Sequence, residues 1–190
     1  HVLLYNREYD RAEYHSRRAI ELNPNDADGT ISMGYLLVQR GQASDAIQWM
    51  EKAVRLNPFH PPWYHAQIAS AFYSLRRYGD CIRATHRLPE IGGWSFRLAA
   101  AYAQIGPVKD ANREAEKILE HDPTFAVDAF IAGTIHLERE ADREILRDGL
   151  LKAGLPRWRL EILCGRRMKF RLGPKLSCRL DCKAGSQPVW

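Results

Sequence analysis

The chain has 190 residues, of which 45% are hydrophobic, 10% aromatic and 27% charged, a composition that supports a buried core and excludes disordered or collagen-like chains. Lys and Arg outnumber Asp and Glu by 28 to 23. Residues 157–190 alone hold nine basic and two acidic residues. The remainder of the chain is therefore slightly acidic and has no electrostatic preference for a polyanion.

The apolar runs, the start of the chain and its cysteines bear on membrane association, on the length of the parent protein and on the cellular compartment. No apolar run approaches the roughly 20 residues that cross a bilayer, so we expect no membrane span. Because the sequence starts at His1 without a signal peptide, we expect a fragment of a longer protein. Four scattered cysteines do not form a disulfide framework, which predicts a cytoplasmic location.

Apolar residues at three- and four-residue spacing predict helices along most of the chain. We expect these helices over six ranges: 26–40, 43–56, 62–76, 94–105, 108–121 and 126–137. Pro, Gly or Asp bounds each range, and Gly41 and Gly106 suit a left-handed turn after the first helix of a pair. No strand pattern is present, so the sequence predicts an all-α chain.

The helix pairs recur with a period of about 34 residues. Three pairs of residues share an offset of 34: Ala12 and Ala46, Ala19 and Ala53, Pro24 and Pro58. The third unit follows at an offset of 35. In the fourth, Gly106 takes the place of Gly41, and the unit ends at Asp122-Pro123. Small residues such as Gly34 let paired helices approach closely.

This period, with small residues at fixed places and a closing Asn-Pro or Asp-Pro, resembles the tetratricopeptide repeat, a helix-turn-helix unit. The resemblance covers residues 1–125 and implies about four repeats, the first truncated, in a right-handed α-solenoid. Residues 126–156 would add a further helix pair with a C-terminal capping helix, and residues 157–190 would form a poorly ordered basic tail. The third unit departs from the pattern at Cys81, Thr85 and Leu88, so we expect its second helix to be irregular.

The capping helix is amphipathic, with four apolar residues expected on its inner side: Ile145, Leu146, Leu150 and Leu151. The sequence of residues 140–156 also resembles the C-terminus of bacterial proteins that join a class III adenylate/guanylate cyclase domain to tetratricopeptide repeats. That resemblance implies the regulatory or docking part of a larger bacterial signalling protein, with a cyclase domain of the same parent chain as a partner. None of the metal-binding or nucleotide-binding residues of such a cyclase can be placed here.

The repeat register predicts a partner-binding groove on the concave side, lined by first helices. One acidic and four aromatic residues should face it: Asp28, Tyr35, Trp63, Tyr73 and Phe96. Aromatic anchors are typical of interface hot spots, although Trp63 and Phe96 could instead pack between helices. Members of the family that grip a terminal carboxylate use Lys, Arg and Asn on this side, where this chain has residues such as Ile31 and Ala100. The groove is therefore mildly apolar and suits an internal helix or a neighbouring domain.

No catalytic motif is present, so we expect no enzyme activity and no cofactor. His60 and His65 are expected to be a loop residue and a packing residue. Cys164, Cys178 and Cys182 leave a tetrahedral zinc one ligand short, so no metal site is expected. The predicted function is a protein-protein interaction scaffold that binds a protein or peptide segment. The alternative is binding of nucleic acid or an anionic surface through the basic tail.

Overall fold

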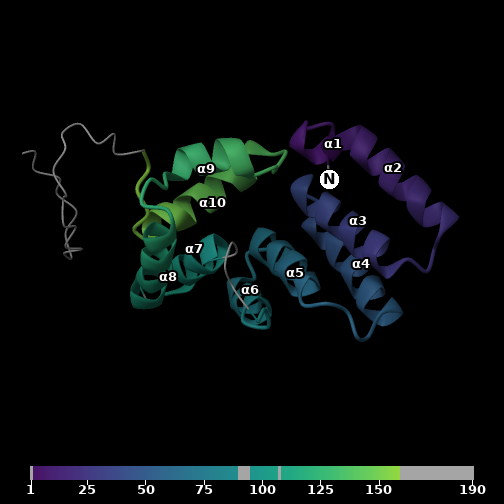
Figure 1. The fold of residues 1–190 in the computed structure, drawn as a ribbon, viewed down its shortest axis with the longest axis horizontal. Coiled ribbons are helices and arrows are strands. Elements are labelled where there is room, and N and C mark those ends of the chain that lie inside the picture. Colours follow the sequence, from purple (N-terminus) through teal and green to yellow (C-terminus); the bar gives the residue numbers. More distant parts are fainter. Residues whose placement is uncertain (1, 90–94, 107, 159–190) are drawn as a thin grey trace, which may run out of the picture. The chain divides into compact units, whose positions relative to one another are not determined.

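The computed structural model describes residues 2–89, 95–106 and 108–158 (Figure 1). The chain divides into two units, and these residues belong to the first, residues 1–160. They fold into helices and connecting turns without any strand, which confirms the all-α prediction. The helices are α1 (Val2–Tyr5), α2 (Tyr9–Leu22), α3 (Ala27–Gln39), α4 (Ala43–Leu56), α5 (Trp63–Ser74), α6 (Tyr78–Thr85), α7 (Ser95–Ile105), α8 (Val108–His121), α9 (Val127–Thr134) and α10 (Glu140–Lys152).

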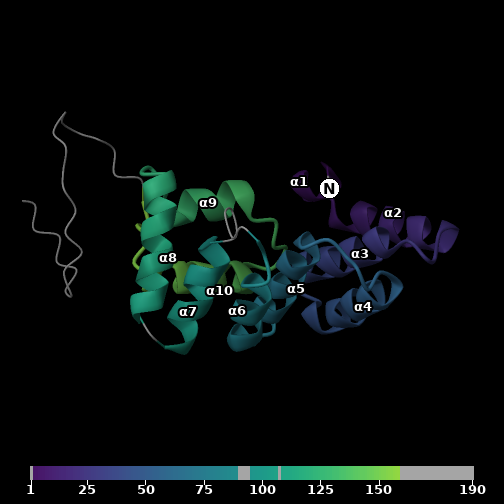
Figure 2. The same cartoon turned by 60° about the horizontal axis from the view of Figure 1, so that its bottom comes forward.

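Consecutive helices pack in pairs, of which α3 with α4 is the most extensive (Figure 2). A Cβ atom at Gly34 would lie 2.8 Å from the Met50 Cγ atom and 3.0 Å from the Ala46 carbonyl oxygen. Both distances are too short for a carbon contact, so the missing side chain sets the separation of the two helices. The expectation that small residues permit this close pairing is confirmed here.

The turn inside each of the first three units has one left-handed residue at the same repeat position: Arg7, Gly41 and Arg76, with φ of 58°, 75° and 59°. Around Gly41, the amide of Gln42 donates to the Leu37 carbonyl at 2.8 Å, and the Gly41 amide donates to Val38 at 3.0 Å. These two bonds form a Schellman motif, which satisfies the last carbonyls of the helix. The left-handed turn predicted at Gly41 is confirmed. The backbone at Gly106 is more extended, because its φ of 153° is far from the values of 58–75° at the three other turns.

The second helix of the third unit is short, as its departure from the repeat pattern predicts. α6 has eight residues, whereas α4 and α8 have 14 each. After Thr85, the amides of Arg87 and Leu88 make tight turn bonds to carbonyls three residues earlier, and Pro89 has no amide hydrogen to continue the helix. The chain therefore leaves the helical path about two turns earlier than in the neighbouring units.

The C-terminal helix pair differs in its bounds from the expected ranges. α9 ends at Thr134, and Ile135 is extended with φ of −94° and ψ of 124°. The side chains of Ile135 and Leu137 are buried in the core around α7 and α10, which favours an extended path over another helical turn. α10 also ends in a Schellman motif, at Gly154, whose φ is 91°.

Candidate functional site

Helix α10 covers part of the inner face that the sequence predicts as a groove. It packs mainly on α7, as a capping helix would, and also contacts α8 and α9. The Tyr73 hydroxyl in the last turn of α5 donates to the Ile145 carbonyl of α10 at 3.3 Å. The Gln104 amide in the last turn of α7 donates to Asp148 at 3.0 Å. α10 therefore crosses the C-terminal ends of two first helices.

Close approach of α10 to these helices depends on Gly149. A Cβ atom there would lie 2.6 Å from the Tyr73 hydroxyl oxygen and 3.0 Å from the Ala100 Cβ atom. On either side of this glycine in the helix, Leu146 and Leu150 are fully buried. The fit of a glycine onto Ala100 shows that the inner face at α7 holds a helix, and that this helix belongs to the chain itself.

Residues 135–139, here called the bridging segment, connect α9 to α10 and reach the first two repeats (Figure 1). The Glu138 amide donates to the Gln39 carbonyl at the end of α3, at 2.7 Å. The Tyr9 hydroxyl of α2 donates to the His136 carbonyl at 3.0 Å. The bridging segment thus joins parts of the chain that are about 100 or more residues apart in sequence.

Arg40, next to α3, links the same elements by charge. Its guanidinium lies 2.7 Å from Asp10 and 2.7 Å from Glu13 of α2, and 3.3 Å from Glu138 of the bridging segment. The side chains of Arg40 and Glu13 are only 18% and 17% exposed. An ion pair at this depth is less screened than a surface pair, so it contributes to holding α2 against the end of α3.

The five residues predicted to line the groove fall into two groups. Tyr73 contacts α10, and the Phe96 ring packs against the Phe130 ring of α9 with centroids 4.8 Å apart. Phe96 thus makes a contact between helices, the alternative weighed for it from the sequence. Asp28 and Trp63 lie instead in the first turns of α3 and α5, at the other end of these helices, and Tyr35 is half-buried in α3.

Tyr64 connects Asp28 and Trp63, and sequence reasoning missed it. Its buried hydroxyl donates to the Asp28 carboxylate at 2.5 Å, and its ring contacts the Trp63 ring with centroids 4.5 Å apart. Burial, and next the hydrogen bond to Asp28, raises the pKa of Tyr64, so the hydroxyl remains a donor. Asp28 and Trp63, with Tyr64 beneath them, are called the open end here. Tyr35 lies about two turns further along α3 and is not part of it.

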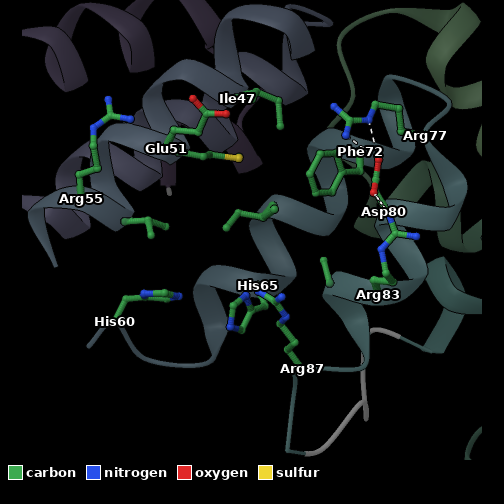
Figure 3. Close-up of a pocket in the computed structure, with 14 residues that line it drawn as sticks. Ile47, Glu51, Arg55, His60, His65, Phe72, Arg77, Asp80, Arg83 and Arg87 are labelled. Carbon is green, nitrogen blue, oxygen red and sulfur yellow. Dashed lines mark hydrogen bonds and ion pairs between the residues drawn. The ribbon is translucent and has the colours of Figure 1, made fainter. Parts of the chain in front are cut away.

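A pocket between α4, α5 and α6 is a second feature that the sequence reading missed (Figure 3). Its volume is about 570 Å³. It includes His60 and His65, whose rings lie 5.1 Å apart in an edge-to-face contact. The signal for it in the sequence was the irregular third unit, because the early end of α6 leaves the side of α4 uncovered.

The described residues contain no cluster of His, Cys, Asp and Glu that could hold a metal ion. Burial raises the pKa of Cys81 to about 11, so this thiol stays protonated and is a packing residue. The cysteines considered for zinc, Cys164, Cys178 and Cys182, lie outside the described residues, as does nearly all of the basic tail at 157–190. Within the described ranges, no helix has both the length and the apolarity of a membrane-spanning segment.

Comparison with known proteins matches part of the chain to a repeat family. A family model described as a tetratricopeptide repeat matches residues 3–68. Protein O-mannosyl-transferase Tmtc2 of Drosophila melanogaster is 37% identical over 59 residues, which are 30% of this chain and only 6% of that protein's length. Two crystal structures of MamA each give a TM-score of 0.52 at 20% identity. One match covers 76% of this chain and 86% of the MamA chain, and the other covers 77% and 81%. This likeness concerns the fold, and it supports the predicted solenoid.

Proposed function

Taking residues 3–68 as tetratricopeptide repeats, we propose that the chain is a protein-interaction scaffold that binds a partner segment at the open end, over the first turns of α3 and α5. The observation that carries this proposal is the division of the inner face. α10 covers it at the C-terminal ends of α5 and α7, while Trp63, whose ring contacts that of Tyr64, remains 38% exposed. A half-exposed tryptophan on a rigid helix is a typical interface anchor.

Displacement of α10 by a partner is the less favourable route. Leu146, Leu150 and Leu155 of this segment are at most 3% exposed. Burial of one leucine is worth about 1.5–3 kcal/mol, so exposing three costs roughly 5–9 kcal/mol. A partner with micromolar affinity supplies about 8 kcal/mol. Displacement would consume nearly all of that free energy, so the proposal places the partner where the first helices are already accessible.

The chemistry of the open end favours a partner segment that has a basic residue beside an apolar one. Asp28 accepts one hydrogen bond from Tyr64, and as a carboxylate it has capacity for further donors. Phe59, at 96% exposure in the turn before α5, adds apolar surface close in sequence to Trp63. A partner segment could place a cationic group against the Asp28 carboxylate and pack an apolar side chain on Trp63.

The test compares three forms of the full chain in affinity capture followed by mass spectrometry. The Asp28→Ala/Trp63→Ala variant should lose specific partners at least tenfold relative to the parent. The control variant Tyr14→Ala/Glu21→Ala removes an exposed aromatic side chain and a carboxylate from α2. It should retain the partners that the parent chain captures. Equal capture by all three forms would refute the open end as the site. Tyr73→Ala is unsuitable here, because Tyr73 binds α10.

The finer assignment, that the chain is the regulatory or docking part of a bacterial signalling protein with a class III adenylate/guanylate cyclase domain, is also a proposal, as is a cytoplasmic location. Its support is the resemblance of residues 140–156. Those residues form α10 and the turn after it, whose leucines have a packing role in this fold. The sequence encoded upstream of His1 tests it, since a cyclase domain there supports the assignment and a different domain refutes it.

A further inference from the structure

The α4–α6 pocket lies on a different face of α5 from the groove. α5 directs His65, Ile68 and Phe72 toward the pocket, whereas Tyr73 points to α10. Six apolar side chains form much of its lining: Ile47, Met50, Val54, Ile68, Phe72 and Ala84. A volume of about 570 Å³ is within the range of pockets that hold ligands or peptide side chains. The pocket is therefore distinct from the face that α10 covers. At His60 it adjoins the open end, because the His60 ring stacks on the Tyr64 ring with centroids 5.1 Å apart.

The rim of this pocket has unbalanced positive charge. Four arginines and two carboxylates line it. Arg77 and Arg83 both pair with Asp80, so the Asp80 carboxylate is not available to the other two arginines. Among the residues that the structure describes, Arg55 and Arg87 have no ion-pair partner. Two guanidinium groups thus remain available to an anionic ligand.

His60 adds an unsatisfied polar atom on the same side. Its Nδ1 atom lies 3.2 Å from the Asn57 carbonyl oxygen, and its Nε2 atom is buried without a hydrogen-bond partner in the described part of the chain. A buried polar atom without a partner is uncommon and costs free energy. Figure 3 shows His60, His65 and Arg87 along one side of the pocket, opposite Glu51 and Phe72.

We propose that the α4–α6 pocket binds an acidic peptide segment in which a carboxylate lies beside a large apolar side chain. The apolar side chain would pack on Ile68 and Phe72, and the carboxylate would lie near His60 and Arg87. Glu51 on the opposite wall repels a carboxylate, so it fixes the direction in which the segment enters. This partner differs in charge from the one proposed for the open end.

The test begins with a displayed library of random 12-residue peptides selected on the full chain. Enriched peptides should contain Asp or Glu next to a large apolar residue, and the strongest is labelled for fluorescence anisotropy. Arg55→Gln/Arg87→Gln should weaken its binding at least tenfold, because the charge-assisted contact to Arg87 and the second positive charge of the rim are both lost. Both residues are exposed, so the fold should be unaffected. Arg18→Gln/Lys109→Gln removes the same charge elsewhere and should change binding less than twofold.

Three results would overturn the proposal: enrichment of peptides without acidic residues, no enrichment at all, or equal binding of the selected peptide to Arg55→Gln/Arg87→Gln. The Asp28→Ala/Trp63→Ala variant separates the two surfaces. It leaves Arg55 and Arg87 in place and reaches the pocket only through the contact of Tyr64 with His60, so it should bind the acidic peptide within about threefold of the parent, whether or not the open end binds its own partner. Loss of the acidic peptide in that variant alone would place it at the open end and refute the pocket.

Discussion

Replacing Gly149 in α10 by alanine should destabilise the fold, although alanine is the better helix former. The added Cβ atom would lie 2.6 Å from the Tyr73 hydroxyl oxygen and 3.2 Å from the Ala100 carbonyl oxygen. Tyr73 is buried, and a backbone carbonyl in α7 cannot retreat without moving the helix. Overpacking of this kind costs about 1–3 kcal/mol, against a gain of up to about 1 kcal/mol in helix propensity. We expect a net loss of about 1 kcal/mol.

Gly133 in α9 provides a matched control. No atom lies within 4 Å of the Cβ position there, so Gly133→Ala should gain about 0.5–1 kcal/mol from propensity alone. Urea unfolding followed by circular dichroism measures both changes as shifts of the midpoint. The two variants should shift in opposite directions. If Gly149→Ala raised the midpoint as much as Gly133→Ala, α10 would not pack on α5 and α7 as described.

Adding Tyr73→Phe to each background tests the contact itself. In the parent chain, this change removes the hydrogen bond to the Ile145 carbonyl and should cost about 1 kcal/mol. In Gly149→Ala, it removes the atom nearest to the new methyl group and should cost less or improve stability. A double-mutant cycle should therefore give a coupling of about 1 kcal/mol. Additive effects would show that the Tyr73 hydroxyl and position 149 are not in contact.

Three further predictions concern stability. Arg76→Gly should stabilise the fold by about 1 kcal/mol in urea unfolding, because an arginine at φ of 59° is strained and glycine is not. Arg40→Met should destabilise it by about 1–3 kcal/mol, and less in 1 M salt, because the contacts to Asp10 and Glu13 are lost. Burial, and next the charge of Arg7, lowers the pKa of His136 below 6.5, so the unfolded chain binds its proton more readily and the free energy of unfolding should fall as the pH drops below 6.5. Unfolding curves between pH 7.5 and 5.5 should be less pH-dependent in His136→Asn.

Each of these has a contrary outcome. An unchanged or lower midpoint for Arg76→Gly would mean that the left-handed turn is not strained. Salt-independent loss in Arg40→Met would assign its effect to packing of the side-chain stem. The same pH dependence in His136→Asn and the parent would assign the acid sensitivity to other groups, of which His65 is one, since burial lowers its pKa as well.

The repeating part of the fold could be predicted from sequence because its determinants are local. The helices expected at 43–56 and 108–121 are α4 and α8 to the residue, and the other four differ by at most three residues at either end. Gly34 and Gly41 act within one helix pair, so a single unit carries the information for its own geometry. Repetition of that unit then supplied the solenoid.

The placement of α10 could not be predicted in the same way. Its spacing of Leu146 and Leu150 fits a helix that caps the array and equally one that crosses the inner face. The choice depends on Gly149 meeting Tyr73 and Ala100, which lie 76 and 49 positions away in sequence. The α4–α6 pocket was missed for a related reason, because it arises from the early end of α6 beside a neighbouring unit.

The reach of the bridging segment limits how this array can vary in length. α10 has 13 residues and is therefore about 20 Å long. Neighbouring packed helices lie about 8–10 Å apart, so the length of α10 matches two helix-to-helix separations, from α7 past α5 to α3. Solenoids ordinarily tolerate the insertion or loss of a whole unit, because each contacts only its neighbours. Here an added unit between α3 and α7 would carry Gln39 out of reach of Glu138. The hydrogen bond between the bridging segment and α3 therefore fixes the number of units in this stretch.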